Sequence, residues 1–417
     1  MKPERHFKCG TLFLLTLLFL LNLAHLVKAQ SFVFEHRRKR VSLPFKIVKN
    51  LLIVEMTLNG KGPYNFILDT GVGMALITDP SLLDSLTIKD KRDIKIMGLG
   101  DGTDLRASVT PSVLFNITPS IYGNIPAAFL KEDIFDLSGF TGMHIHGLIG
   151  YEFFNSFIVK ISYANRTLTL YKNETAYIPK KGSRVPISVE ERKPYLNAEI
   201  TLDGGRKVNA KLIIDTGAGH PLSLETENGI PFEVPAAHVP ANLGVGLAGP
   251  ISGYIARIPE IKIGKYQLKD VVTSFPNYTA AGSKVVSVGR NGNLGNNILK
   301  RFDVVFDYNR ETMYLRPSMY YKEPFEHDMS GMELISAGSD LNRLIIGRVE
   351  KNSAADESGL EEGDEILSIN FKSVGEMNME DITALFRSKD DRSFILEIIP
   401  HGSKNRERVI LTLKKRI

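Results

Sequence analysis

Residues 66–73 read FILDTGVG, and residues 212–219 read LIIDTGAG. Each run is an apolar segment that ends in Asp-Thr-Gly, and the two aspartates, Asp69 and Asp215, lie 146 residues apart. A second pair of landmarks repeats at nearly the same distance, with GLIG at residues 147–150 and GNLG at residues 292–295. Two separate landmarks in register indicate a duplicated unit, and such a repeat decides the fold before any single motif does.

Each half of the duplication has the pattern of a β structure. Short apolar or alternating runs are separated by Gly and Pro, as expected of strands and turns. Two homologous β lobes would bury a shared core and leave a cleft between them, where a site built from both halves is expected. The predicted strands are residues 48–58, 64–68, 166–171, 195–202, 208–214 and 312–315, and the predicted short helices are residues 80–85, 151–156 and 296–301.

The two Asp-Thr-Gly turns predict an acid–base pair. An Asp that follows an apolar strand is costly to bury unless it is hydrogen-bonded or functional. At equivalent positions of a duplicated lobe, two carboxylates about 3 Å apart cannot both ionise readily, so the pair holds one proton. The ionised member can activate a water, while the protonated member donates to a carbonyl and then assists the leaving amine. This chemistry requires no metal and no cofactor.

At these residues the chain resembles the aspartic peptidases of the pepsin and retropepsin type, over about residues 45–318. The resemblance implies a bilobal, acid-protease-like pair of β-barrels with Asp69 and Asp215 as the catalytic dyad and polypeptides as substrates. It also implies a cross-lobe hydroxyl grip by two threonines, and glycines that let water and substrate approach. These supporting residues are Thr70, Gly71, Thr216 and Gly217.

Three residues depart from the pepsin-like pattern. Val72 and Ala218 replace the Ser or Thr whose hydroxyl orients each aspartate, and Asn293 replaces an aliphatic residue at the start of the second GNLG element. The absence of disulfides is a further difference. These features place the chain nearer a fused, bacterial retropepsin-like pair than a eukaryotic pepsin.

Glycine-rich stretches at residues 97–102 and 244–249 also correspond across the repeat. Neither is followed by the Lys-Ser/Thr of a phosphate loop. We expect mobile hairpin flaps that close over an extended peptide, with plain surface hairpins as the alternative. The flap candidates are Gly98, Gly100, Gly102, Gly244 and Gly246.

The last ninety residues have a different character. Residues 351–370 read KNSAADESGLEEGDEILSIN and resemble a PDZ domain of the bacterial protease type. Such domains capture a C-terminal peptide as an added strand, with its carboxylate on exposed backbone N–H groups. That loop would contain Ser330, Gly331 and Met332. The domain would tether or select substrates, and the alternative is a structural or interaction role.

The N-terminus has the order of a secretory signal peptide. A basic start precedes an apolar run at residues 12–21, and Val27-Lys28-Ala29 supplies a cleavage site. Cleavage would also remove Cys9, the one cysteine, so the mature chain would carry no thiol. An uncleaved anchor is the alternative, although the apolar run is short for a span. An exported chain without disulfides points to a bacterial envelope, in the periplasm or outside the cell, with no stable membrane span after cleavage.

The length of 417 residues favours two or three domains, and 43% hydrophobic with 24% charged residues excludes a mainly disordered or fibrous protein. A net charge of +5 is too small to argue for nucleic acid. We expect a signal peptide at 1–29, protease lobes at 30–178 and 179–320, and a PDZ domain at 325–417.

The predicted function is an aspartic endopeptidase, and the alternative is a non-catalytic envelope protein that binds peptides with its cleft and PDZ domain. A metallo- or serine hydrolase is disfavoured because no His-Glu-x-x-His or Gly-x-Ser-x-Gly occurs. His144 and His146 form a His-x-His pair, for which an exposed loop is a better interpretation than a metal site.

Overall fold

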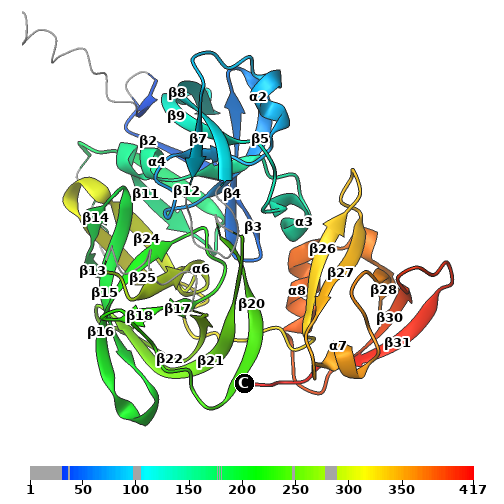
Figure 1. Cartoon of the computed structure of the whole chain (residues 1–417). Helices are drawn as coiled ribbons and strands as arrows, with labels where there is room; N and C mark the ends of the chain where they lie inside the picture. Colours follow the sequence, from blue (N-terminus) through cyan, green and yellow to red (C-terminus); the bar gives the residue numbers. More distant parts are fainter. Residues whose placement is uncertain are drawn as a thin grey trace, which may run out of the picture.

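The computed structural model describes residues 31–35, 38–96, 105–175, 177, 179, 181–246, 249–277 and 289–417. The predicted signal peptide lies outside these residues. Strands make up 52% and helices 11% of the structure, so the prediction of a mainly β fold is confirmed. Figure 1 shows two β lobes, one above the other, and a third β domain at their side. Among the described residues, no helix is long and apolar enough to cross a membrane.

The first lobe is built on one large sheet, in which a short central strand, β10, runs parallel to β5 and antiparallel to β6. A side chain at Gly147 of β10 would lie 2.3 Å from the carbonyl oxygen of Leu76, so only glycine allows this strand to enter the sheet. The strands in sheet order are β1 (Phe32–Phe34), β9 (Ile121–Leu130), β6 (Ala75–Ile77), β10 (Gly147–Ile149), β5 (Lys61–Leu68), β4 (Leu51–Leu58), β8 (Leu105–Thr118) and β7 (Arg92–Ile96), with β3 (Lys46–Val48) paired to β4.

The second lobe repeats this arrangement. Its short strand β23 runs parallel to β16 and antiparallel to β17, and a side chain at Gly292 would lie 2.0 Å from the carbonyl oxygen of Ser223. The strands in sheet order are β14 (Ser188–Glu190), β15 (Lys193–Thr201), β16 (Lys207–Asp215), β23 (Gly292–Gly295), β17 (Leu222–Leu224), β22 (Tyr266–Pro276), β21 (Gly249–Ile263) and β20 (His238–Gly246), and a small ribbon pairs β18 (Thr226–Glu227) with β19 (Ile230–Pro231).

A six-stranded sheet joins the lobes and carries their pseudo-twofold symmetry. At its centre β11 pairs antiparallel with β24, and Val159 lies opposite Phe306 while Ile161 lies opposite Val304. A single apolar cluster continues through both lobes and this sheet. The strands in order are β13 (Ser183–Pro186), β25 (Thr312–Pro317), β24 (Phe302–Asp307), β11 (Phe157–Ser162), β12 (Thr167–Lys172) and β2 (Arg40–Pro44).

The helices of the lobes are short, as predicted, but one was not foreseen. Residues 80–85, 151–156 and 296–301 contain α2 (Ser81–Ser85), α4 (Tyr151–Ser156) and α6 (Asn296–Leu299), and the unforeseen helix is α3 (Leu137–Thr141). Single 3₁₀ turns are η2 (Asp203–Gly205) and η4 (Tyr308–Arg310).

The strand predicted over residues 48–58 is present as β4, but it begins three residues later, at Leu51. The chain turns back at Lys49 and Asn50, whose φ angles are 48° and 65°, and β3 then pairs with β4 as a hairpin. Positive φ at both central residues is the geometry of a tight two-residue hairpin turn.

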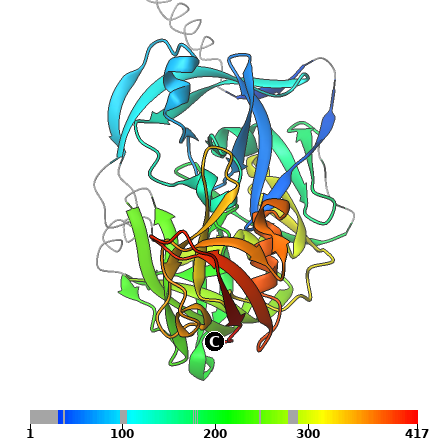
Figure 2. The same cartoon turned by 90° about the vertical axis from the view of Figure 1, so that its right-hand side faces the viewer.

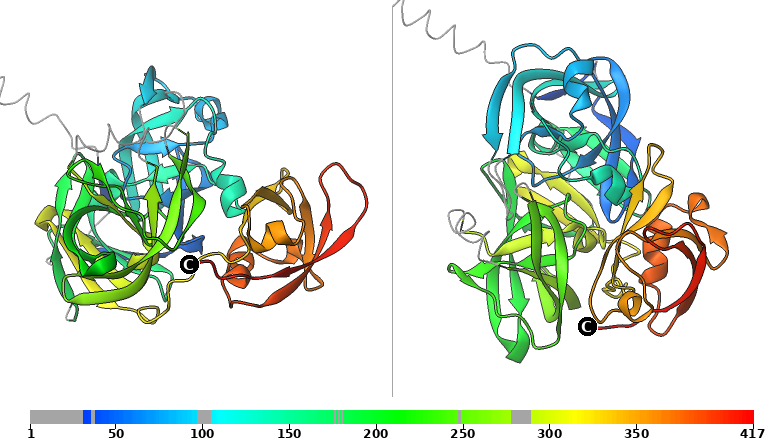
Figure 3. Two further views of the ribbon diagram at one scale, coloured as in Figure 1. Left: turned by 60° about the horizontal axis from the view of Figure 1, so that its bottom comes forward. Right: turned by 45° about the vertical axis from the view of Figure 1, so that its right-hand side comes forward.

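The C-terminal domain has one sheet, in which five strands are paired in sequence and a sixth short strand pairs at the side, and it has two helices. In order, its strands are β26 (Met332–Ala337), β27 (Arg343–Val349), β28 (Glu365–Ile369), β30 (Ser393–Ile399) and β31 (Glu407–Thr412), with β29 (Lys372–Ser373) beside β28; its helices are α7 (Ala354–Glu357) and α8 (Met379–Phe386), with η5 (Val374–Glu376). Seen from its own side, the domain lies in front of the junction of the two lobes (Figure 2). Figure 3 shows from two further sides that β26 and α8 face the lobes and that β31 is on the outside.

Candidate active site

The structure brings Asp69 and Asp215 together at the junction of the lobes. Asp69 directly follows β5, and its backbone N–H donates to the carbonyl oxygen of Ile149 in β10 at 2.8 Å. Asp215 ends β16 and lies opposite Gly295 of β23. The short central strand of each lobe therefore fixes the turn that presents its carboxylate.

Two threonines grip each other beneath the carboxylates. The backbone N–H of Thr70 donates to Oγ1 of Thr216 at 3.0 Å, and the reciprocal bond is 2.9 Å. Each hydroxyl then donates across the lobe boundary, Thr70 to the carbonyl of Ile214 at 2.6 Å and Thr216 to that of Leu68 at 2.7 Å. Both threonines are fully buried, so these four bonds hold the two turns in one geometry.

The glycine of each triplet lies under the other lobe's carboxylate. A side chain at Gly217 would lie 2.2 Å from Cγ of Asp69, and one at Gly71 would lie 3.3 Å from Cγ of Asp215. The Gly71 N–H also donates to Oδ1 of Asp69 at 2.7 Å, and Gly217 does the same for Asp215 at 2.9 Å. Any larger residue at position 217 would push the two carboxylates apart.

Burial and mutual repulsion act on the dyad together. Asp69 is only 8% exposed, and burial raises its pKa well above the usual range, with the charge of Asp215 as the second cause. The two carboxyl groups lie within hydrogen-bonding reach, while the Gly71 N–H and the charge of Lys193 oppose the rise in the pKa of Asp69. The arrangement keeps a proton on the pair over a range in which an exposed aspartate is ionised.

The two lobes differ in one polar contact. Asn293 of β23 donates through Nδ2 to Oδ2 of Asp215 at 2.6 Å. The equivalent position in β10 is Leu148, which has no donor. The sequence signal was the Asn in place of an aliphatic residue, but its contact with Asp215 was not foreseen.

His220 and Tyr308 also surround the dyad and were not predicted. The Tyr308 hydroxyl is buried without a hydrogen-bond partner, and burial followed by the charge of Asp69 raises its pKa well above the usual range. His220 lies five residues after Asp215, and burial lowers its pKa.

A cavity of about 220 Å³ opens beside Asp215. Its wall includes Leu243 of β20 and Ile251 of β21, so the hairpin of the second glycine-rich stretch borders the site. Gly244 and Gly246 lie near the end of this hairpin, and their role as a flap stays a prediction. Gly98, Gly100 and Gly102 lie outside the described residues. The remaining lining residues are Gly71, Lys193, Ile213, Asp215, His220, Ser223, Glu225, Ser274, Pro276, Arg290 and Asn293.

The predicted carboxylate-binding loop of the C-terminal domain has its donors occupied. The N–H groups of Ser330 and Gly331 donate to Oδ1 of Asp328 at 2.9 and 3.1 Å, and that of Met332 donates to Oγ of Ser330 at 3.1 Å. Ser330 is fully buried. In this geometry the loop has no free N–H for a peptide carboxylate at these three residues.

The space between β26 and α8 is in contact with the first lobe. The backbone N–H of Lys49 donates to Glu380 of α8 at 2.6 Å, and its ammonium donates to the carbonyl of Leu334 in β26 at 3.2 Å and lies 3.9 Å from the ring centroid of Phe140. Apolar residues of the lobe, among them Val48 and Leu51, share one cluster with the core of the C-terminal domain. The lobe therefore contacts the edge where an added peptide strand would pair.

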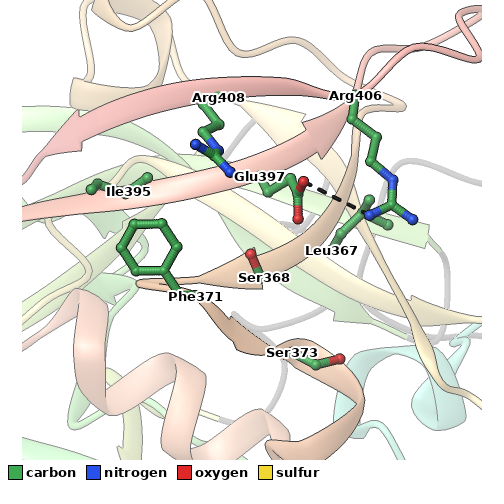
Figure 4. Close-up of a pocket in the computed structure, with 8 residues that line it drawn as sticks. All are labelled: Leu367, Ser368, Phe371, Ser373, Ile395, Glu397, Arg406 and Arg408. Atoms are coloured by element: carbon green, nitrogen blue, oxygen red, sulfur yellow. Dashed lines mark ion pairs between the residues drawn. The ribbon is translucent and has the colours of Figure 1, made fainter.

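A second hollow, of about 400 Å³, lies on the C-terminal domain itself (Figure 4). Ile395 and Glu397 line it and alternate with the buried Leu396 and Ile398, so it opens on the face of the sheet that is turned away from the core. Its ion pair, Arg406 to Glu397, is loose at 3.8 Å. It offers no paired carboxylates and no activated nucleophile.

No metal site is visible in the part of the chain that the structure describes, where no three His, Cys, Asp or Glu side chains gather. His146 accepts a hydrogen bond from the N–H of Asn65 at 3.2 Å, and its ring contacts Tyr64. This partner explains His146 without a metal.

The comparisons with known proteins agree with this architecture. Residues 54–153 match a family model described as aspartyl protease, and residues 345–400 match a PDZ domain model. The chain therefore contains an aspartyl protease domain and a C-terminal PDZ domain, which confirms the resemblance drawn from the sequence. The aspartyl protease match includes Asp69 and ends before Asp215, so the second lobe is identified by the internal repeat.

Two solved structures show remote similarity. A photosystem II D1 C-terminal processing protease is 18% identical over 21% of this chain and 23% of that chain, with a TM-score of 0.20. The chain thus spans less than a quarter of that protease. The aspartic proteinase from Irpex lacteus is 10% identical over 68% of this chain and 99% of that chain, with a TM-score of 0.43. No curated protein matches the chain.

Proposed function

We propose that this protein is an aspartic endopeptidase that hydrolyses peptide bonds with a water activated between Asp69 and Asp215. The single observation that carries the proposal is the pair of carboxylates, each presented over the other lobe's glycine and held by the reciprocal threonine bonds. Two carboxyl groups with one proton between them supply both the base and the acid that amide hydrolysis needs.

The ionised carboxylate of the pair removes a proton from the attacking water. The protonated carboxyl donates to the carbonyl oxygen of the peptide as the tetrahedral intermediate forms. The proton taken from water then passes to the leaving amine as the C–N bond breaks, and a hydroxyl of the intermediate returns its proton to the other carboxylate as the product carbonyl forms, which regenerates the singly protonated pair. The role of the chain is to hold both groups, exclude bulk water from the buried Asp69 side and align an extended peptide against the β20–β21 hairpin.

The test compares Asp69→Asn and Asp215→Asn with the wild-type protein on an unfolded protein substrate across acid to neutral pH. We expect each variant to lose at least about 1000-fold in activity, because removing one member of a catalytic pair disables the pair as a whole. Asp203→Asn is the matched control, because Asp203 is exposed in η2 and should leave activity unchanged.

Wild-type rates in both dyad variants would overturn the proposal. If wild-type protein that is folded by circular dichroism shows no hydrolysis at any pH, the enzyme proposal also fails. Peptide binding without cleavage would then support the alternative function, a non-catalytic peptide-binding protein.

A further inference from the structure

The dyad is asymmetric although the fold around it is symmetric. The backbone donors to the two aspartates match, with Gly71 serving Asp69 and Gly217 serving Asp215. Asn293 adds a short side-chain bond to Asp215 alone. Within the described ranges, the only side chain within hydrogen-bonding reach of the Asp69 carboxyl is Asp215 itself.

A donor to one carboxylate stabilises its ionised form. Two carboxyls that share one proton respond to such a difference strongly, because the proton moves to the member with less support. Ala218 and Val72 both lack the hydroxyl that would orient each aspartate, and Asn293 supplies a side-chain donor to Asp215, whereas the equivalent Leu148 supplies none to Asp69. The geometry thus gives the two aspartates different environments.

We infer that Asn293 is a positioning residue that determines which aspartate of the dyad holds the proton, with Asp215 as the ionised base and Asp69 as the protonated acid. This inference rests on the proposed function. It assigns roles to two groups that the duplicated sequence leaves equivalent.

His220 is the titratable side chain that interacts with the Asn293 amide. Oδ1 of Asn293 and Nε2 of His220 are both buried without a partner of full hydrogen-bond geometry, and the two side chains interact. Burial is the main cause of the lowered pKa of His220, against the opposing charge of Asp215, and it favours the neutral imidazole, which has one N–H to donate. An N–H directed at Oδ1 leaves the amide NH₂ facing Asp215; the flipped amide would place an oxygen against the carboxylate.

Other charged and titratable groups face this unit. Lys193 of β15 acts on Asp69, and Tyr308 of η4 lies near both aspartates. Glu225 and Arg290 line the same cavity but neutralise each other in a buried ion pair of 2.9 Å. None of these groups donates a hydrogen bond to Asp215, so Asn293 is the side chain that distinguishes it.

The test is the pH profile of kcat/KM for Asn293→Leu, which copies Leu148 of the first lobe. Loss of the donor should raise the lower pKa of the dyad, so the acid limb moves to higher pH by roughly one unit, a tenfold loss of rate on the acid side. Asn293→Thr retains a hydroxyl donor and should recover most of the shift. His220→Leu should move the limb in the same direction by less.

The pseudo-symmetry supplies the matched control. Leu148→Asn combined with Asn293→Leu moves the donor to the other lobe, and the acid limb should return toward its wild-type position with the roles of the aspartates exchanged. Unfolding midpoints of all variants show that each is folded. A purely structural Asn293 would lower the midpoint and the rate without moving the limb.

The outcomes separate this inference from the proposed function. Superimposable acid limbs in wild type and Asn293→Leu, with Asp215→Asn inactive, overturn the inference and leave the enzyme proposal intact. If wild-type protein is inactive, carbon NMR titration of the Asp carboxyls replaces kinetics as the readout. Equal titration of the two aspartates would then overturn the inference on its own.

Discussion

Asp69 is a residue whose burial destabilises the folded protein. A raised carboxyl pKa means that the folded state holds the proton more tightly than the unfolded state, whose aspartate has the ordinary value of 3.8. Above the raised pKa the buried charge costs stability in full. Between that pKa and 3.8 the cost falls as pH falls, because the folded state is protonated first.

Asp69→Asn is therefore expected to stabilise the protein while abolishing activity. The amide keeps an oxygen for the Gly71 N–H and carries no charge, so the free energy of unfolding at pH 7 should rise by roughly 1–2 kcal/mol. Urea unfolding at pH 7 and pH 4 measures the gain, which should shrink at the lower pH. Asp203→Asn should show no gain, and a variant less stable than wild type at pH 7 would contradict the burial argument.

The features of the site that both copies of the repeat share were predictable from the sequence. Equivalent positions in two copies meet on the pseudo-twofold axis, so the pairing of the two aspartates followed from the repeat, whereas the threonine grip was implied by the resemblance to aspartic peptidases. Asn293 stood out in the sequence as a departure from the pattern and His220 did not, and the contact between them depends on the rotamers of a strand residue and a loop residue. The repeat predicts what the two lobes share, and it does not predict a contact that only one lobe has, such as that of Asn293 with Asp215.

At the scale of elements, the strands were predictable and their breaks were not. Residues 48–58 form an apolar run with one Lys-Asn step, and the hairpin turn there lacks the usual glycine. Because both β3 and β4 have buried residues, hydrophobic periodicity could not show that the chain reverses. The helix α3, which contacts β26, was missed because five residues carry little periodicity.

The connection between the second lobe and the PDZ domain depends on one buried side chain. Arg301, which follows α6, is 1% exposed and donates to the carbonyls of Tyr320, Glu323 and Pro324. Its guanidinium lies 3.6 Å from the ring centroid of Phe325. One cation therefore satisfies three carbonyl groups of the connecting segment.

Arg301→Met should destabilise the protein by about 2–4 kcal/mol, because the carbonyls lose their donors in apolar surroundings. Thermal unfolding measures the loss, and trypsin cleavage after Lys322 should become faster as the segment loosens. Arg206→Met, at an exposed pair with Glu227, is the control and should cost less than about 1 kcal/mol. Equal losses in the two variants would show that Arg301 has no special role.

For the whole molecule, the β3–β4 turn is the point at which all three bodies meet. Lys49 bonds to β26 and α8 of the PDZ domain. Asn50, the next residue, donates to the carbonyl of Gly219 at 2.9 Å and accepts from Lys300 at 2.9 Å, both in the second lobe. Gly219 lies four residues after Asp215, so the turn connects the PDZ domain with the loop that carries one aspartate.

This junction should respond to pH through Lys49. Burial is the main cause that lowers its pKa from 10.5 to about 8, with the nearby Arg387 as the second cause. Below pH 8 both folded and unfolded states are protonated, and the folded state bears the full cost of the buried charge. Between about 8 and 10.5 only the unfolded state keeps the proton, so stability rises with pH in this window.

Lys49→Met removes that titration. The difference in stability between wild type and this variant therefore gives the pH dependence that is due to Lys49 and not to other lysines. From pH 8 to 10.5 the wild-type protein should gain roughly 2–3 kcal/mol in free energy of unfolding relative to the variant. Urea unfolding gives the energies, and hydrogen exchange of the β26 amides shows whether the gain is at the docked edge. Lys46→Met, at an exposed pair with Glu55, should show no such pH-dependent difference. If wild type and Lys49→Met change in parallel over this window, Lys49 is not held in the low-polarity junction that the fold describes, and the PDZ domain is not docked through it.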